Sequence, residues 1–371
     1  MTKKSLNLSS LNNQISRRDF LIGMGLITGG ALLAGCKPMS SAVESTEEVK
    51  EIATVRAQAN WIKQVQYNGF YAAILKGFYE KEGINGDLLA GGPGIVSMRV
   101  LDAKQCEVAL VGSIDAYINS FVGGAKLRMI GATFQRSPAG LIYLADNPIE
   151  TPQDAVGKRI GLQEGATQAW QVVCAKNGLN METDMEIITV GYDPTPLIDG
   201  TVDGYWGYAT SQTGVIRAQG YEVGVLDPWI WGNRSYGNIM IVREDDLQEN
   251  LDVLVRWLRA TVQGHVYANK HIDELVKYTV DTYGEEYGLD FDQQLDEATA
   301  QVEYLESDLT KEKGLFWFDK AVLQENLDTL VSLGEIEADV APTPDEISSF
   351  EVLEGVFKDG VDAVNKPALE M

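Results

Sequence analysis

Between residues 52 and 242 the sequence alternates short apolar segments with amphipathic ones. Residues 52–61 show period-two alternation, and residues 69–82 have helical spacing that ends at Gly83. Further strands are expected at 107–111, 127–134, 140–144, 158–162, 185–190, 204–208, 222–225 and 238–242. Short strands alternating with helices predict an α/β fold with mostly parallel sheets, because parallel strands need a crossover connection.

The pattern changes after residue 249. Long amphipathic helices are predicted over 251–269, 272–282, 291–306 and 319–333. A chain of 371 residues corresponds to roughly two domains or lobes of ordinary size.

Acidic residues outnumber basic ones: 54 Asp and Glu against 30 Lys and Arg give a formal charge of −24. This balance argues against nucleic acid as a partner, because phosphate backbones are bound by basic patches. Only three Cys and two His are present, which excludes a disulfide framework. His265 and His271 do not share one helix face, so no metal site is predicted, and Cys106 and Cys174 are expected to be small buried residues.

Residues 1–35 have the features of an export signal. Arg17 and Arg18 form the pair typical of twin-arginine signals, and the apolar run 20–34 is shorter than the roughly 20 residues that a membrane span needs. Leu33-Ala34-Gly35-Cys36 resembles a lipobox, in which the cysteine becomes the lipidated first residue. We therefore expect an exported protein, anchored by lipid at Cys36 to the outer face of the cytoplasmic membrane or in the periplasm. Residues 36–50 would be a flexible tether; an uncut membrane anchor is the alternative.

Five segments in register carry a family resemblance: 61–83, 111–116, 149–162, 197–205 and 253–268. In this order they resemble the solute-binding proteins of ABC importers, in the group that binds nitrate, sulfonates and thiamine pyrimidines. The resemblance covers roughly residues 55–282, and no single segment decides it.

The resemblance implies a type II periplasmic-binding-protein fold: two α/β lobes with a ligand cleft and hinge strands. Lobe 1 would comprise residues 51–138 and 240–371, and lobe 2 residues 139–239. The implied function is capture of a small solute by a monomer that delivers it to an ABC permease and its ATPase on other chains. No cofactor is implied.

Two loops of this fold are expected to face the cleft. Ser113 follows the strand that ends at Val111, and Thr167 follows the strand that ends at Leu162. Both lie where helices begin, so backbone N–H groups and hydroxyls there can receive a polar or anionic ligand group. The alternative is that both side chains only cap their own helices.

Aromatic residues gather at the ends of the predicted strands, which suits a flat ring. The candidate aromatic ligand-binding residues, with the neighbouring amide Asn68, are Trp61, Tyr67, Phe70, Tyr71, Trp170, Tyr205, Trp206 and Tyr236. Alternation along a strand makes Tyr205 face away from Trp206. Trp61→Ala and Trp206→Ala are expected to weaken ligand binding with little loss of stability. Trp257 and Trp317 have apolar neighbours and are expected in the core.

Charged residues near the same loops are further candidates. Glu164, Asp193 and Asp203 can accept hydrogen bonds from ring amines or hydroxyls, and Arg136 can pair with an anion. Ordinary solvated, capping or ion-paired roles are the alternative for all four.

The ligand itself stays open. The stretch 64–72, with Gly91-Gly92-Pro93, resembles receptors proposed for riboflavin and for thiamine pyrimidine precursors. Nitrate, taurine and alkanesulfonates are the alternatives. An enzyme resembling thiamine-pyrimidine synthase is disfavoured, because the clustered Cys motif of that family is missing. A sensor domain without transport partners is a further alternative.

Overall fold

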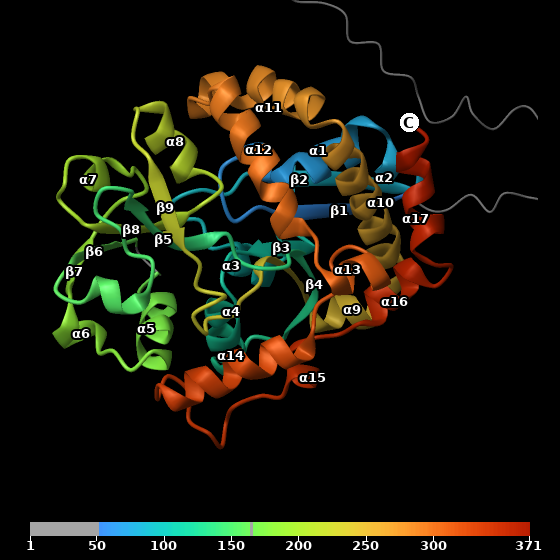
Figure 1. Cartoon of the computed structure of the whole chain (residues 1–371). Helices are drawn as coiled ribbons and strands as arrows, with labels where there is room; N and C mark the ends of the chain where they lie inside the picture. The colour runs from blue at the N-terminus through green and yellow to red at the C-terminus, as the bar shows by residue number, and fades with distance from the viewer. Residues whose placement is uncertain (1–51, 164–165) are drawn as a thin grey trace, which may run out of the picture. The chain divides into compact units, whose positions relative to one another are not determined.

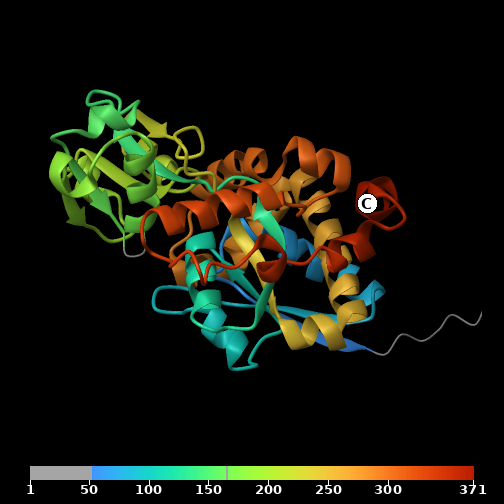
Figure 2. The same cartoon turned by 90° about the horizontal axis from the view of Figure 1, so that it is seen from below.

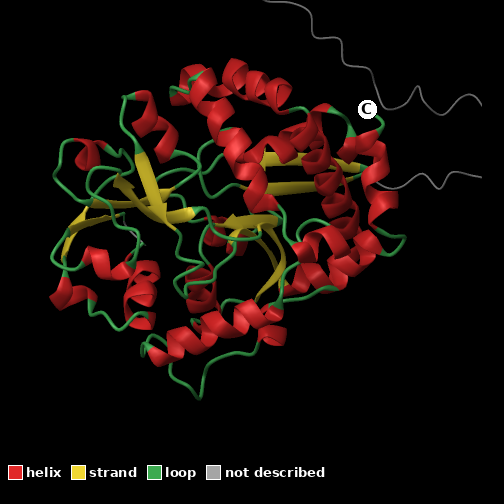
Figure 3. Ribbon diagram, in the orientation of Figure 1, coloured by secondary structure: helices red, strands yellow, loops and turns green. Residues whose placement is uncertain are grey.

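Two five-stranded mixed sheets organise the part of the chain that the computed structural model describes, residues 52–163 and 166–371. Figure 1 labels strands β1 to β9, and Figure 3 shows the strands in yellow. Each sheet has three parallel strands followed by one that runs antiparallel to both of its neighbours. The predicted α/β class is confirmed.

The first sheet has the strand order β2-β1-β3-β10-β4. Its strands are β1 (Ala53–Gln58), β2 (Ile84–Leu89), β3 (Val108–Val111), β4 (Leu127–Phe134) and β10 (Gly237–Arg243). The short helices between them are η1 (Val65–Tyr67), α1 (Asn68–Leu75), α2 (Phe78–Lys81), α3 (Ser97–Asp102) and α4 (Ile114–Val122).

The second sheet repeats this arrangement in the order β7-β6-β8-β5-β9. Its strands are β5 (Ala139–Leu144), β6 (Arg159–Leu162), β7 (Glu186–Thr189), β8 (Gly204–Tyr208) and β9 (Val223–Leu226). Its helices are η2 (Pro152–Ala155), α5 (Thr167–Lys176), α6 (Met181–Asp184), α7 (Thr195–Ile198) and α8 (Gln212–Ala218).

The chain passes between the sheets twice, through residues 135–138 and 227–236. The second passage leads into β10, which pairs with β3 and β4 and so belongs wholly to the first sheet. The division into lobes at residues 139 and 240 stays a prediction; the returning strand begins at Gly237.

Nine helices follow β10. They are α9 (Glu244–Glu249), α10 (Leu251–Lys270), α11 (Ile272–Tyr287), α12 (Phe291–Leu305), α13 (Asp308–Lys313), α14 (Lys320–Ser332), α15 (Pro344–Ile347), α16 (Glu351–Phe357) and α17 (Val361–Leu369). Figure 2 shows them, from yellow-brown to red, gathered around the first sheet, while the green second-sheet elements stand to one side. Within the described part of the chain, none of the helices has the length and apolar character needed to cross a membrane.

The predicted helix 69–82 is two helices. It breaks at Gly77, whose φ of 68° lies in the left-handed region that glycine adopts without strain. Helix α11 instead continues past residue 282 to Tyr287 and ends at Gly288, again with a left-handed φ of 66°. The boundaries predicted for α10, α12 and α14 agree with the structure within one residue.

Helix α10 crosses α1 at very close range. A Cβ at Gly264 would lie 2.1 Å from the Gly69 carbonyl oxygen, and one at Gly69 would meet the His265 ring at a similar distance. His265 is buried between Phe70 and Phe316, and its Nδ1 bonds to the Thr261 carbonyl. Burial lowers the pKa of His265 to about 4, so the ring is a neutral core residue.

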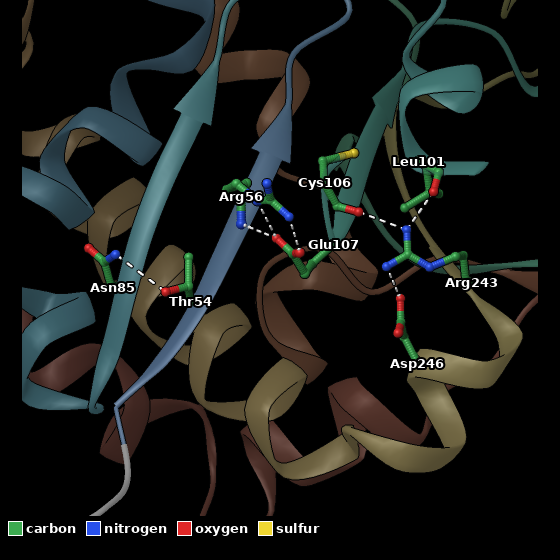
Figure 4. A network of polar contacts seen from close by, with 8 residues as sticks. All are labelled: Thr54, Arg56, Asn85, Leu101, Cys106, Glu107, Arg243 and Asp246. Atoms are coloured by element: carbon green, nitrogen blue, oxygen red, sulfur yellow. Dashed lines mark hydrogen bonds and ion pairs between the residues drawn. The ribbon is translucent and has the colours of Figure 1, made fainter. Parts of the chain in front are cut away.

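Side-chain hydrogen bonds and ion pairs link the strands of the first sheet at the end where β1 and β3 begin (Figure 4). Arg56 forks onto Glu107, with its Nη2 2.7 Å and its Nε 3.1 Å from the two carboxylate oxygens. Arg243 donates to the Leu101 and Cys106 carbonyls and pairs with Asp246. These pairs hold the strand ends in register and leave the opposite, carboxyl edge for the site.

Candidate functional site

A cleft of about 740 Å³ lies at the carboxyl ends of the parallel strands. This volume is within the range of small-molecule sites. The cleft is lined by the segments that follow β1, β2, β3, β6 and β7, by the end of β8, and by both passages between the sheets. Carboxyl ends of parallel strands are where open α/β sheets bind ligands.

Five aromatic side chains line the cleft: Trp61, Tyr192, Trp206, Tyr208 and Trp229. Trp61 follows β1 of the first sheet and Tyr192 follows β7 of the second. Their ring centroids are 4.4 Å apart, with an interplanar angle of 57°. The two sheets therefore contribute aromatic faces to the same cavity.

Carboxamides are the commonest polar side chains of the lining. Eight are present: Asn60, Gln64, Gln66, Asn119, Gln163, Gln168, Gln212 and Asn233. Each carboxamide offers both donors and an acceptor, so the set suits the mixed polar edge of a neutral heterocycle.

Ionisable groups are scarce in the cleft. Among the described lining residues there is no Lys, Arg or His, and Asp115 is the one acid. Burial raises the pKa of Asp115 to about 6 and that of the Tyr208 phenol to about 12. At neutral pH the described lining therefore carries no positive side chain to neutralise an anion.

Tyr67 supports the cleft from behind. Its hydroxyl donates to Asn60 Oδ1 at 2.7 Å and accepts from the Trp61 N–H at 2.9 Å and from Gln66 Nε2 at 3.0 Å. The tyrosine is fully buried, and burial raises its pKa well above the ordinary value. One hydroxyl thus fixes three lining residues.

A buried carboxyl lies behind the same wall. Glu297 of α12 is 3% exposed and accepts from Gln64 Nε2 at 3.1 Å. Burial raises the pKa of Glu297 to about 7, against the opposing effect of the nearby Ser211 hydroxyl. Gln64 follows β1 and Ser211 follows β8, so this carboxyl contacts lining residues from both sheets.

Four of the predicted site residues line the cleft: Trp61, Ser113, Thr167 and Trp206. Ser113 also caps α4, since its hydroxyl accepts from the Ala116 N–H at 3.3 Å. Thr167 makes no side-chain cap at the start of α5 and is exposed to the cleft.

The other predicted residues near β1 lie in the interior. Phe70 and Tyr71 are 2% exposed and pack against Trp257 and Tyr283 respectively. The Asn68 side-chain oxygen accepts from the Thr279 hydroxyl at 3.0 Å. The structure does not bring these residues to the cleft, because α1 turns them toward α10 and α11.

Residues of the second sheet divide by face. Trp206 and Tyr205 alternate as predicted: Trp206 lies in the cleft-side cluster with Trp170, and Tyr205 in the cluster on the other face. Trp170 is fully buried and donates to Met185 Sδ, and Tyr205 donates to the Gly191 carbonyl. Neither Trp170 nor Tyr205 lines the cleft.

The predicted charged residues mostly bond within the protein. Arg136 pairs with Asp227 and Glu303, and Asp203 forks onto Arg159, which lowers the pKa of Asp203. Asp193 accepts from the backbone and hydroxyl of Thr195.

None of Arg136, Asp203 and Asp193 lines the cleft. Tyr236 accepts from the Asp319 N–H and is buried, so it does not either. Glu164 and Cys36 lie outside the described residues.

Sequence reasoning missed Tyr192, Gln163, Asn60 and Asp115. A signal was available for Tyr192 and Gln163, since each follows a predicted strand within three residues, whereas Asn60 was predicted inside the first strand, which in the structure ends at Gln58. Asp115 is one helix position past Ile114, and only the packing around α4 makes it face a cavity.

This arrangement defines a class. Two mixed α/β sheets, joined by two passages and sharing a cleft, are the fold of the periplasmic binding proteins. The aliphatic sulphonate binding protein SsuA from Escherichia coli has a similar structure, with a TM-score of 0.60 and 15% identity over 76% of this chain and 87% of that one. The desulfurization enzyme DSZB is also similar, with a TM-score of 0.55 and 16% identity over 82% of this chain and 99% of that one. At these identities the likeness concerns the fold.

The chain belongs to the NMT1/THI5-like family, whose model matches residues 64–275. It is 21% identical over 258 residues to the formylaminopyrimidine-binding protein of Halalkalibacterium halodurans, covering 68% of this chain and 76% of that protein. It is 22% identical over 285 residues to the riboflavin-binding protein RibY of Chloroflexus aurantiacus, covering 76% of this chain and 81% of that protein. The expected resemblance to solute-binding proteins of ABC importers is confirmed.

Proposed function

We propose that this protein is the substrate-binding component of an ABC importer and that it captures a small, flat heteroaromatic solute. The observation that carries this proposal is the lining of the cleft, with its five aromatic rings, eight carboxamides and no described basic side chain. Aromatic walls stack on a ring, and carboxamides bond to its polar edge.

The relatives support a heteroaromatic ligand. Formylaminopyrimidine and riboflavin, the ligands in the names of two relatives, are both flat nitrogen heterocycles. A sulfonate or nitrate carries a full negative charge, and charge-assisted hydrogen bonds from Arg or Lys are the usual way to bind one. The described lining offers only helix N-termini and neutral donors for that purpose.

The proposed mechanism uses binding alone. The solute enters between the sheets, the passages at 135–138 and 227–236 bend, and the closed protein presents the solute to a permease with its ATPase on other chains. Export by the signal in residues 1–35 and a lipid at Cys36 would hold the monomer at the outer face of the cytoplasmic membrane or in the periplasm. No covalent step on the solute is proposed.

The test is a thermal-shift and calorimetry panel on residues 37–371. The probes are formylaminopyrimidine, riboflavin, taurine, methanesulfonate and nitrate. A ligand at 100 times its dissociation constant stabilises by about 2.7 kcal/mol, a shift of a few degrees in melting temperature. A shift with either heteroaromatic supports the proposal, and a shift with the anions alone contradicts it.

A further inference from the structure

Asp115 occupies an unusual place in the cleft. It lies in the first turn of α4, directly after the loop that follows β3, and its side chain is 7% exposed. It lines the cleft, and its carboxylate makes no hydrogen bond or ion pair within the described part of the chain. A buried carboxylate without a partner is costly, so it needs a reason.

The surrounding charges do not neutralise it. Glu335, after α14, is the charged group that acts on Asp115, and it adds to the effect of burial in raising the Asp115 pKa to about 6. Arg234 lines a small cavity of about 10 Å³ that Asp115 and Asn233 also line. That arginine is already paired with Glu325, at 2.8 Å, and lies over the Trp229 ring.

Helix stabilisation alone does not account for Asp115. An acid in a first turn interacts favourably with the helix dipole, but an exposed carboxylate would do so without desolvation. The capping bond of α4 is made by Ser113 instead. Burial is therefore not needed to stabilise the helix, and its result is that the carboxylate is held at the wall of the cleft.

A second acceptor faces the same cavity. Gln64 Nε2 donates to Glu297 Oε1 at 3.1 Å and to Gln66 Oε1 at 3.3 Å, so both amide hydrogens of Gln64 are used inside the protein. The carbonyl oxygen of Gln64 has no donor within the described residues. Glu297 thereby orients Gln64 as an acceptor toward the cleft.

We propose that Asp115 is a specificity-determining residue of the cleft: its carboxylate anchors an amino or ring N–H group of the ligand and excludes anions. This deepens the proposed function and rests on it only in taking the cleft as the ligand site. The ligand donates hydrogen bonds to the Asp115 carboxylate and to the Gln64 side-chain oxygen. These bonds offset the free-energy cost of desolvating the carboxylate.

The first test compares dissociation constants of wild type and Asp115→Asn by calorimetry at pH 7.5 and pH 5, with formylaminopyrimidine and riboflavin as probes. At pH 7.5 we expect Asp115→Asn to bind the probe whose N–H group reaches Asp115 at least about tenfold more weakly than wild type does. A tenfold change in the dissociation constant is the size expected for the loss of a hydrogen bond to a charged group. The gap should shrink at pH 5, where Asp115 is protonated. Asp102→Asn, an exposed acid at the end of α3, is the matched control. Equal affinities for wild type and Asp115→Asn, at both pH values, would overturn the inference while leaving the proposed function standing.

A second test separates the role of Asp115 from the proposal of a heteroaromatic ligand. Its probes are putrescine, which is an aliphatic diamine, and methanesulfonate. Binding of putrescine alone, lost in Asp115→Asn, would support the role of Asp115 and contradict a heteroaromatic ligand. Binding of methanesulfonate by wild type would overturn the inference directly.

A measurement of the melting temperature without ligand tests the alternative that the Asp115 carboxylate stabilises α4. An unpaired buried carboxylate destabilises the free protein above its pKa, so Asp115→Asn should melt about one to a few degrees higher than wild type at pH 7.5. The difference should shrink as the pH falls from about 6 toward 3.8, the ordinary pKa of an aspartate, and should be absent below that value. A lower melting temperature for Asp115→Asn at pH 7.5 would show that the carboxylate stabilises α4, and would overturn the inference.

Discussion

The rings of Trp61 and Tyr192 meet across the cleft with their centroids 4.4 Å apart. Trp61 follows the first strand of one sheet, and Tyr192 follows the edge strand of the other, more than a hundred residues away in sequence. Tyr192 remains 44% exposed, so the contact lies at the surface of the cleft. Because the contact joins the two sheets, the opening of the cleft in the proposed mechanism would break it.

Tyr192→Ala is therefore expected to speed ligand release. An aromatic pair contributes about 0.5–1.5 kcal/mol, which corresponds to a two- to tenfold faster dissociation rate. Stopped-flow fluorescence with the bound heteroaromatic measures that rate. Tyr221→Ala, which removes a similarly exposed ring away from the cleft lining, is the control. An unchanged rate in Tyr192→Ala would show that the contact does not hold the cleft closed.

Trp61→Ala and Trp206→Ala should have different consequences. Trp61 is partly exposed and its backbone N–H makes the bond to Tyr67, so its loss should weaken an aromatic ligand by about 1 kcal/mol with little change in stability. Trp206 is 5% exposed and packs against Trp170 with centroids 6.0 Å apart. The expectation of little stability loss is thus corrected for Trp206, where truncation should cost about 3–5 kcal/mol.

Urea denaturation and calorimetry on both variants check this pair. Trp206→Phe is the useful companion, since it keeps most of the packing while reducing the stacking face. If Trp61→Ala lost as much stability as Trp206→Ala, Trp61 would be a core residue.

Glu297→Gln should flatten the pH dependence of stability. Burial raises the pKa of Glu297 to about 7 in the folded protein, above its unfolded value. Between those two pKa values the folded state binds more protons, so stability falls as pH rises through that window and stays reduced above pH 7. The loss is on the order of 3 kcal/mol at most. Urea denaturation from pH 4.5 to pH 8 measures it, and parallel curves for the two proteins would contradict the prediction.

Gly264→Ala should strongly destabilise the first-sheet core. The new Cβ would lie 2.1 Å from the Gly69 carbonyl oxygen and 2.7 Å from the Ala73 Cβ, so α1 and α10 would have to move apart. We expect a loss at the upper end of the roughly 1–3 kcal/mol typical of overpacking. Gly214→Ala in α8 is the control, because its nearest contact would be at 4.0 Å and alanine favours a helix. Equal melting temperatures for the two variants would contradict the close crossing.

Cys36→Ser should release the exported protein from the membrane. The lipobox interpretation makes Cys36 the lipid acceptor, and a serine cannot form the thioether. Fractionation of cells that express the full chain measures the membrane-bound share, with Cys174→Ser as the control cysteine. A Cys36→Ser protein that remains in the membrane fraction would contradict the lipid anchor.

Periodicity predicted most of the elements. Short apolar runs located β3, β4, β5, β6, β8 and β10, and helical spacing located α10, α12 and α14. Strands that are buried on both faces are apolar throughout, and a helix that is buried on one face is apolar along that face. Gly77 shows the limit: only its left-handed backbone divides a helix that the spacing alone predicts as continuous.

For the candidate site, the sequence by itself determined that aromatic residues lie on and after the predicted strands. It placed Trp61, Ser113 and Thr167 at or after strand ends and Trp206 within a strand. The tertiary structure decided the rest. Packing buries three predicted site residues in the core: Phe70, Tyr71 and Trp170. Ion pairs with residues distant in sequence hold Arg136 and Asp203. The meeting of Trp61 with Tyr192 and the burial of Asp115 depend on how two sheets and α14 come together. Local sequence encodes the faces of an element, whereas the contents of a cleft depend on which elements approach one another in space.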